Sequence, residues 1–366
     1  MLKNLCYVAE FSLPNNKAYT IHVIKMLNAL NEHFRSCELI IPYKDNKYEY
    51  SHLAKNFLLK KKKFYIKSIF FNKYQLTFLL RIIFSLKAAI YIKKNNIIIT
   101  RSVITSFFLI LLKRTHVLEI HHEFYGLSKF LFINLNFINS KYIRKLICVS
   151  KALKNFYKKK TKNSIALPDA VDIEFYKIKK IPKNIKNIYY IGSFYSGRGI
   201  ELIIEIAKIL KNINFILYGL RNDDSNNLIN LPKNIKIFKF IEHSKVPTLL
   251  HKADLVLMPY SLSHIGIASI KNNINTVKYA SPLKMFEYLA SGTPLMASNL
   301  PVLKEILKNG YNSIIVKDNN PYSWANQIIK IQKNIKLRKI ISMNAIKTAK
   351  QNTWNIRAKK ILKFFK

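Results

Sequence analysis

The chain has 366 residues, 49% of them hydrophobic, which is enough for two packed cores and excludes an intrinsically disordered chain. Three widely spaced cysteines (Cys6, Cys37 and Cys148) exclude a disulfide-bonded scaffold and are typical of reduced thiols in a cytoplasmic protein. Its 62 Lys and Arg residues against 19 Asp and Glu give a net charge of +43, which favours a polyanion or an anionic membrane surface as partner, the alternative being a basic surface with no dedicated partner.

Short runs with strand character alternate with longer runs of helical periodicity, which predicts an α/β protein with parallel sheets covered by helices. A helix from residue 18 to about 33 is expected after the first strand, because isoleucine and leucine recur there at every third position. In the first half, the predicted strands cover residues 4–9, 37–42, 97–100, 117–120, 146–149 and 164–167.

The polar loop after the first strand, residues 10–17, is a candidate part of the ligand site. In doubly wound sheets this loop borders the ligand crevice, so Asn15, Asn16 and Lys17 are candidates for contacting donor or acceptor. A solvated turn is the alternative for each of them.

Residues 57–95 are basic and aromatic. Lysines at 60–63 lie beside Phe64 and Tyr65, and the run 76–92 is strongly apolar. Cations and aromatic rings of this kind are typical of a peripheral membrane face. The alternative is a buried strand and helix whose lysine side chains extend to solvent.

His121-His122-Glu123 follows the predicted strand 117–120. Polar groups at the carboxyl end of a parallel strand face the crevice, which makes His121 a candidate, although a packing or hydrogen-bonding role is the alternative. Since no cysteine or further histidine stands at ligand spacing, we expect no metal site here.

A Lys- and Pro-containing linker at 177–186 marks the expected domain boundary. We expect a first domain over 1–177, a second over 178–350, and a basic helix within 351–366 that is able to return to the first domain. Strands are predicted at 187–191, 215–218, 235–238 and 254–258, a helix at 245–252 and a polar loop at 261–278, and Asp223-Asp224 is predicted to be a surface pair.

The Gly-rich run 192–199 stands between the strand 187–191 and a helix predicted over 200–210. It matches only the first part of a nucleotide P-loop, and Arg198-Gly199 stand where that motif needs Lys and a hydroxyl, which excludes an ATPase. Arg198 beside Gly-rich backbone still suits phosphate oxygens. A plain turn with a surface arginine is the alternative.

The stretch 281–306 reads SPLKMFEYLASGTPLMASNLPVLKEI and predicts a loop, a helix capped by Gly292, and a strand. The free amides of a helix N-terminus suit a phosphate or diphosphate. Glu287 lies one turn further in, where a carboxylate can accept hydrogen bonds from sugar hydroxyls. An ordinary capped helix is the alternative.

Several separated runs resemble retaining glycosyltransferases of the GT-B class, family-4 type, whose C-terminal half is the glycosyl transferases group 1 domain. The resemblance covers nearly the whole chain, is strong in the C-terminal half and is weak before His116. It implies two Rossmann-like domains with parallel sheets facing across a cleft that holds the active site. The matching runs lie at 147–156, 167–176, 190–210, 247–260, 281–307 and 353–362.

The resemblance also implies roles for individual residues. Arg198 matches the cation that neutralises the donor diphosphate, Glu287 matches the acid that contacts the nucleotide ribose, and His121 matches the histidine near the transferred sugar. The loop whose backbone amides hold the diphosphate corresponds to Ser281, Pro282, Leu283 and Lys284.

Three positions depart from the family pattern. Tyr279 stands where the family has an acid eight residues before Glu287, and Ser193 stands where it has an arginine. Asp169-Ala170 replaces the Asn-Gly of an Asn-Gly-Val-Asp segment. Lys284 and Arg221 are candidates to replace the missing cation, and Tyr279 joins the candidate donor or acceptor contacts.

The resulting hypothesis is a hexosyltransferase that moves a sugar from a nucleotide-diphosphate sugar to a lipid-linked or cell-surface glycan, in cell-envelope polysaccharide biosynthesis. The resemblance implies retention of configuration and independence of metal and cofactor. No secretory signal follows Met1 and the longest uncharged apolar run is about half of a bilayer span, so we expect a cytoplasmic protein, peripheral on the inner membrane face. The alternatives are a catalytically weak GT-B-like nucleotide-sugar-binding or partner protein, and a nucleic-acid-binding protein, for which no recognition motif is evident.

Overall fold

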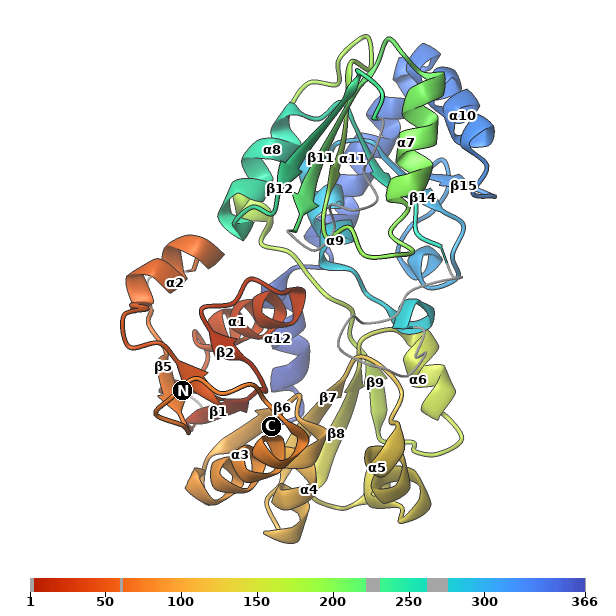
Figure 1. Cartoon of the computed structure of the whole chain (residues 1–366). Coiled ribbons are helices and arrows are strands. Elements are labelled where there is room, and N and C mark those ends of the chain that lie inside the picture. Colours follow the sequence, from red (N-terminus) through yellow and green to blue (C-terminus); the bar gives the residue numbers. More distant parts are fainter. Residues whose placement is uncertain (1–2, 60–61, 222–230, 262–275, 366) are drawn as a thin grey trace. The chain divides into compact units, whose positions relative to one another are not determined.

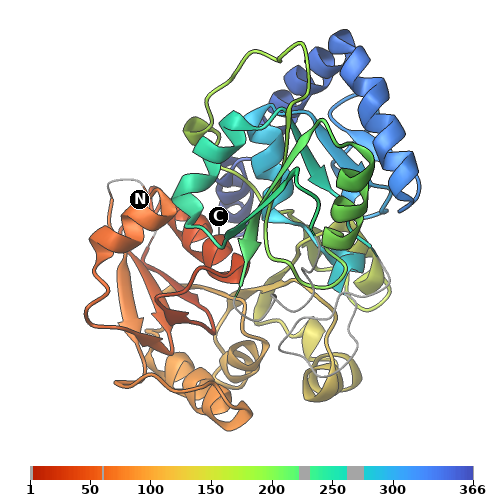
Figure 2. The same ribbon diagram turned by 45° about the horizontal axis from the view of Figure 1, so that its top comes forward.

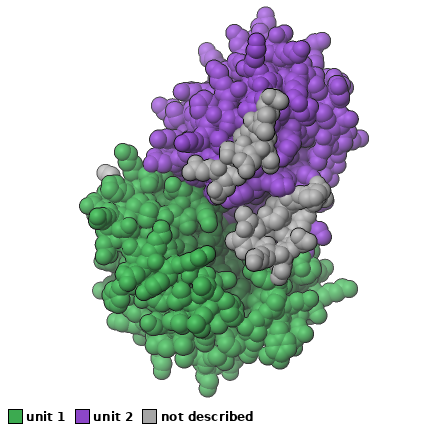
Figure 3. All heavy atoms as spheres, viewed as in Figure 1, with its two compact units in different colours: residues 1–168, 354–366 green, residues 169–353 purple. Residues whose placement is uncertain are grey.

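The computed structural model describes residues 3–59, 62–221, 231–261 and 276–365. It divides the chain into two compact units (Figures 1 and 3). Unit 1 comprises Met1–Pro168 and Trp354–Lys366, and unit 2 comprises Asp169–Thr353. The predicted pair Asp223-Asp224 and most of the predicted loop 261–278 lie outside the described residues.

Unit 1 is built on a seven-stranded parallel sheet with the order β5-β3-β1-β6-β7-β8-β9. The strands are β1 (Leu5–Val8), β3 (Cys37–Ile41), β5 (Tyr65–Ser68), β6 (Ile97–Thr100), β7 (His116–Ile120), β8 (Ile143–Cys148) and β9 (Ser164–Ala166), and β2 (Ser12–Leu13) pairs separately with β4 (Tyr43–Lys44). The helices are α1 (Ala18–Leu30), α2 (Tyr50–Phe57), α3 (Phe78–Tyr91), α4 (Val103–Leu111), α5 (Gly126–Lys129), α6 (Lys151–Tyr157) and α12 (Trp354–Leu362). Helix α12 packs beside α1, so the two stretches of unit 1 share one core.

Unit 2 is built on a six-stranded parallel sheet with the order β12-β11-β10-β13-β14-β15. The strands are β10 (Asn187–Ile191), β11 (Asn214–Leu220), β12 (Ile235–Lys239), β13 (Leu255–Met258), β14 (Leu295–Ser298) and β15 (Ile314–Val316). The helices are α7 (Ile200–Ile209), α8 (Val246–Lys252), α9 (Leu283–Ser291), α10 (Pro321–Lys333) and α11 (Ile335–Lys350). Helices α7 and α10 lie side by side, and α11 packs on α9 (Figures 1 and 2).

The strand order decides which loops meet. Neighbouring parallel strands end at the same edge, so the residues that follow β1, β6 and β7 meet at the carboxyl edge of unit 1. In unit 2, β10 lies between β11 and β13, which brings the loop 192–199 to the residues that follow β13. The predicted α/β architecture of two Rossmann-like units with parallel sheets is confirmed.

Several element bounds differ from those predicted. Strands β6 and β10 have the predicted bounds, because unbroken apolar runs define them. Strand β8 begins three residues earlier than predicted, at Ile143, because the exposed Arg144 interrupts the apolar pattern. Helix α1 ends at Leu30 rather than near residue 33.

The linker 177–186 lies inside unit 2, whereas the sequence places the domain boundary at residue 177. The buried guanidinium of Arg338 donates to the carbonyl of Pro182 at 2.7 Å and to that of Lys183 at 2.6 Å. These bonds hold the linker against α11, a distant contact that a composition shift does not reveal.

Candidate functional site

Two loop-to-helix junctions of unit 2 meet at the ring of Tyr260. In the loop between β10 and α7, the guanidinium of Arg198 lies 4.5 Å from the centre of that ring. At the start of α9, the ammonium nitrogen of Lys284 lies 5.5 Å from the same ring and 4.0 Å from the ring of Tyr190. Two basic side chains are thus gathered at one point, an arrangement suited to neutralising a diphosphate.

Close backbone approach at this point requires glycine. A Cβ added at Gly192, whose φ is +155°, would lie 2.0 Å from Nζ of Lys284. A Cβ at Gly199, whose φ is +78°, would lie 2.0 Å from the carbonyl oxygen of Pro259. The glycine at 199 therefore lets the loop 192–199 approach the backbone after β13, and the glycine at 192 leaves room for the Lys284 amine.

The ammonium nitrogen of Lys284 is buried and has no hydrogen-bond partner among the described residues. Burial, and after it the charge of Arg198, lower the pKa of Lys284 well below its ordinary value, and Glu287 opposes this only in part. Contact with two aromatic faces favours the charged form to a smaller degree. The amine is therefore buried beside a second cation without a hydrogen-bond acceptor among the described residues.

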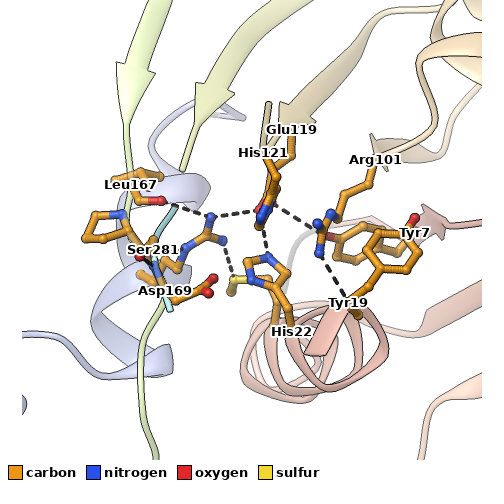
Figure 4. A network of polar contacts seen from close by, with 12 residues as sticks. Tyr7, Tyr19, His22, Arg101, Glu119, His121, Leu167, Asp169 and Ser281 are labelled. Carbon is orange, nitrogen blue, oxygen red and sulfur yellow. Dashed lines mark hydrogen bonds and ion pairs between the residues drawn. The ribbon is translucent and has the colours of Figure 1, made fainter. Parts of the chain in front are cut away.

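The residues Ser281, Pro282 and Leu283 lead into α9 as the sequence predicts. The Ser281 hydroxyl oxygen accepts a hydrogen bond from the Asp169 backbone N–H at 2.8 Å (Figure 4). Pro282 is the N-cap residue, in extended conformation, and Leu283 is the first helical residue. In this turn, all of which the structure describes, no side chain caps the helix and no acidic residue is present. The Met285 amide already donates to the Pro282 carbonyl at 2.9 Å, so the capacity to bind an anion belongs to the amides that precede it.

Glu287 lies one turn further into α9 and is buried. Nε2 of His243 lies 2.7 Å from its Oε1, an arrangement that orients the carboxylate. Sequence reasoning missed His243, because it is a lone histidine 44 residues away in a polar segment. Tyr279, at the end of a short helical turn, is also buried, and its role in binding stays a prediction.

In unit 1, hydrogen-bond donors converge on the carboxylate of Glu119, in β7 (Figure 4). Its Oε1 lies 2.6 Å from Nε2 of His22 and 2.8 Å from Nε2 of His121. Nη2 of Arg357 donates to the same oxygen at 3.0 Å, and the Tyr7 hydroxyl donates to Oε2 at 3.4 Å. Through these contacts the carboxylate connects α1, α12, β1 and the end of β7. Sequence reasoning found only His121, and the missed signal is an acid inside a buried strand.

At neutral pH, Glu119 is ionised and His121 is neutral. Burial raises the pKa of Glu119, but Arg357 and then His22 and His121 outweigh it and bring that pKa well below its ordinary value. Burial and Arg101 lower the pKa of His121 to about 3. With its Nε2–H directed at the carboxylate, the 22% exposed His121 side chain has Nδ1 as an acceptor for a ligand hydroxyl.

A second acid lies at the same sheet edge. Glu10, after β1, accepts hydrogen bonds from Nε of Arg81 at 2.5 Å and from the hydroxyl of Ser102, which follows β6. The guanidinium of Arg101 lies 4.1 Å from the ring centre of Tyr19. Sequence reasoning did not single out this group, although each strand-end position was a usable signal.

The side chains of His22, Glu119 and His121 offer three ligand atoms within 4.8 Å of one another, a spacing that could hold a metal ion. However, the shared Glu119 oxygen already accepts a hydrogen bond from Arg357. A fixed guanidinium charge on that oxygen repels a second cation, so the group fits an ion-pair network better than a metal centre.

The predicted loop residues lie at the start of α1. Oδ1 of Asn15 accepts a hydrogen bond from the backbone N–H of Lys17 at 2.9 Å, and Lys17 is the exposed N-cap. Asn16 is half-buried. Contact of these three residues with donor or acceptor stays a prediction.

Known glycosyltransferases are similar to this chain in sequence. Residues 172–348 match the family model Glycosyl transferases group 1. The uncharacterized glycosyltransferase MJ1178 of Methanocaldococcus jannaschii is 24% identical over 218 residues, which are 57% of this chain and 56% of that protein. The chain thus spans little more than half the length of the curated relatives it matches.

Two solved structures are similar over 98% of both chains. Anabaena Alr3699/HepE in complex with UDP and glucose has a TM-score of 0.71 at 14% identity. WaaG, a glycosyltransferase involved in lipopolysaccharide biosynthesis, has a TM-score of 0.64 at 11% identity. The chain therefore has the GT-B fold, and its residues 172–348 match the model of the glycosyl transferases group 1 family.

Proposed function

We propose that this protein is a glycosyltransferase that uses a nucleotide-diphosphate sugar as donor. The observation that carries the proposal is the meeting of Arg198 and Lys284 at the ring of Tyr260, beside the first turn of α9. Departure of a nucleoside diphosphate is limited by the negative charge that develops on it. Two basic side chains and the helix amides, positioned before the donor binds, stabilise that charge.

The chemistry we propose needs no metal ion, because side chains and amides supply the positive charge. In unit 2, Glu287 binds the ribose hydroxyls and His243 holds it in position. In unit 1, neutral His121 accepts a hydrogen bond from the transferred sugar. Retention of the anomeric configuration follows from the family resemblance and is part of the proposal.

For the acceptor, we propose a lipid-linked or cell-surface glycan reached at an anionic membrane surface on the cytoplasmic side. Helix α3 and its flanks expose a set of large apolar side chains: Tyr65, Phe71, Tyr74, Phe78, Leu79, Leu86, Ile90 and Tyr91. Exposed lysines are interspersed with them: Lys67, Lys73, Lys87, Lys93 and Lys94. Apolar side chains among cations suit anionic headgroups.

WaaG, which shares the fold, is involved in lipopolysaccharide biosynthesis. None of the helices in the described ranges combines the length and apolar character that a bilayer crossing requires.

The donor is tested first by binding. We expect one of UDP, GDP, ADP and dTDP to raise the melting temperature. The substitution R198Q should weaken the affinity for that nucleotide about tenfold or more, because a charge-assisted contact is lost. Lys330→Met, an exposed residue of α10, is the matched charge-loss control and should behave like wild type.

Transfer is tested with radiolabelled sugars of the nucleotide that binds, incubated with membrane lipid extract in the presence and absence of EDTA. Transfer of label to lipid both with and without EDTA supports the proposal. Absence of both nucleotide binding and transfer contradicts it. Nucleotide binding without transfer across a broad acceptor panel would favour the alternative, a catalytically weak nucleotide-sugar-binding protein. The buried Tyr279, standing where the family has an acid, is the observation that favours that alternative.

A further inference from the structure

Lys284 has the reverse of the usual lysine arrangement. A lysine near a surface normally buries its aliphatic stem and keeps its ammonium in water. Here the residue as a whole is half-buried, yet Nζ itself is buried and has no hydrogen-bond acceptor within the described ranges. A permanent ammonium would lose its hydration there and gain only two aromatic faces in exchange.

The groups around Nζ come from four segments of unit 2. Tyr190 of β10 and Tyr260 after β13 supply the two rings, and burial raises the pKa of both phenols, so they are neutral at physiological pH. Arg198, on the loop before α7, supplies a positive charge. On α9 itself, Glu287 is the negative neighbour, and its Oε1 is engaged by His243.

These surroundings favour the neutral amine when no ligand is bound. Burial contributes most to lowering the pKa of Lys284, Arg198 adds to it, and Glu287 opposes both. A diphosphate beside Arg198 and Lys284 would reverse the balance, since it brings two or more negative charges to the amine.

We propose that Lys284 replaces the cation missing at Ser193, and that its amine takes up one proton from solvent when the donor's diphosphate binds. The new N–H bond forms on Nζ, and the proton returns to solvent when the nucleoside diphosphate leaves. This inference rests on the proposed function, because it assigns a charge change to the same donor site. Lys284 is then positively charged only while the diphosphate is bound.

The test is isothermal titration calorimetry with the nucleoside diphosphate that binds best, at pH 8.0, in HEPES, Bicine and Tris. The slope of the observed enthalpy against the buffer ionisation enthalpy counts the protons exchanged. At this pH, histidines of ordinary pKa and the terminal phosphate are deprotonated. We expect wild type and Lys330→Met to take up close to one proton, and the affinity to fall up to tenfold per pH unit above pH 8.

Two variants separate protonation from simple contact. Lys284→Arg keeps a cation that stays charged throughout, so we expect it to bind the same nucleotide with proton uptake near zero. Lys284→Met should bind at least tenfold more weakly and also take up no proton. Wild type that binds with the same uptake as these variants would overturn the inference while leaving the proposed function intact. Absence of any nucleotide binding by wild type would instead overturn the proposed function, and this inference with it.

Discussion

Replacing Glu119 by glutamine should destabilise unit 1 strongly. The change removes the negative charge that Arg357 faces at 3.0 Å, while the Arg357 side chain stays only 3% exposed. Removing one partner of a buried ion pair costs about 3–5 kcal/mol, because the other charge is left uncompensated. With a urea m-value of about 2–3 kcal/mol/M for a unit of this size, the midpoint should fall by roughly 1–2.5 M.

The chain offers a local reporter for this measurement. Its two tryptophans are Trp324, in unit 2, and Trp354, whose ring centre lies 5.1 Å from that of His22 in unit 1. In a Trp324→Phe background, fluorescence in urea follows unit 1 alone. Glu38→Gln, which changes a partly exposed acid of β3, is the control and should cost less than about 1 kcal/mol.

A double variant at Glu119 and Arg357 gives the most specific test of the ion pair. Arg357→Met combined with E119Q removes both charges, so we expect its loss of stability to be smaller than the sum of the two single losses by more than about 1 kcal/mol. Strict additivity, or a loss below about 1 kcal/mol for E119Q alone, would show that the pair contributes little to unit 1.

The same carboxylate predicts a pH dependence. Because folding lowers the pKa of Glu119, its contribution is fully present above the unfolded value of 4.5 and is lost as the pH falls through the folded value. The urea midpoints of wild type and E119Q should therefore converge as the pH is lowered below 4.5.

Three further results are expected. Gly192→Ala should weaken nucleoside diphosphate binding at least tenfold in calorimetry, since a Cβ there would meet the lysine amine at 2.0 Å, and unchanged affinity would contradict the close approach. His243→Asn should raise the KM for donor about tenfold with little change in kcat, because Glu287 loses a 2.7 Å partner, and a loss confined to kcat would contradict that role. The double change Phe71→Ser and Ile90→Ser should reduce flotation with phosphatidylglycerol vesicles several-fold without moving the melting temperature, whereas equal flotation would contradict the membrane face.

The sequence was most informative where the signal is local. Strands β6 and β10 are unbroken apolar runs, and Gly292 marks the end of α9 by its left-handed conformation, so these features were predicted closely. Arg198 was found from the Gly-rich run 192–199, and Lys284 was found through a family resemblance carried by short motifs.

Long-range features of the site could not be predicted in this way. The partner of Glu119 on α12 lies 238 residues away, and no spacing rule connects them. Lys284 was found as a phosphate ligand, but the burial of its amine depends on rings brought by β10 and by the segment after β13. Burial of this kind results from strand order, which the sequence pattern leaves open.

The discontinuity of unit 1 has a consequence for how the protein is made. Its sheet is encoded before residue 169, but Arg357 lies on the far side of unit 2 in the chain. At about 5–20 residues per second, a ribosome needs roughly 10–40 s to synthesise the stretch between them. During that interval Glu119 lacks its Arg357 partner, so the nascent N-terminal segment is the less stable part of the chain. Unit 2 is the first unit whose residues have all been synthesised.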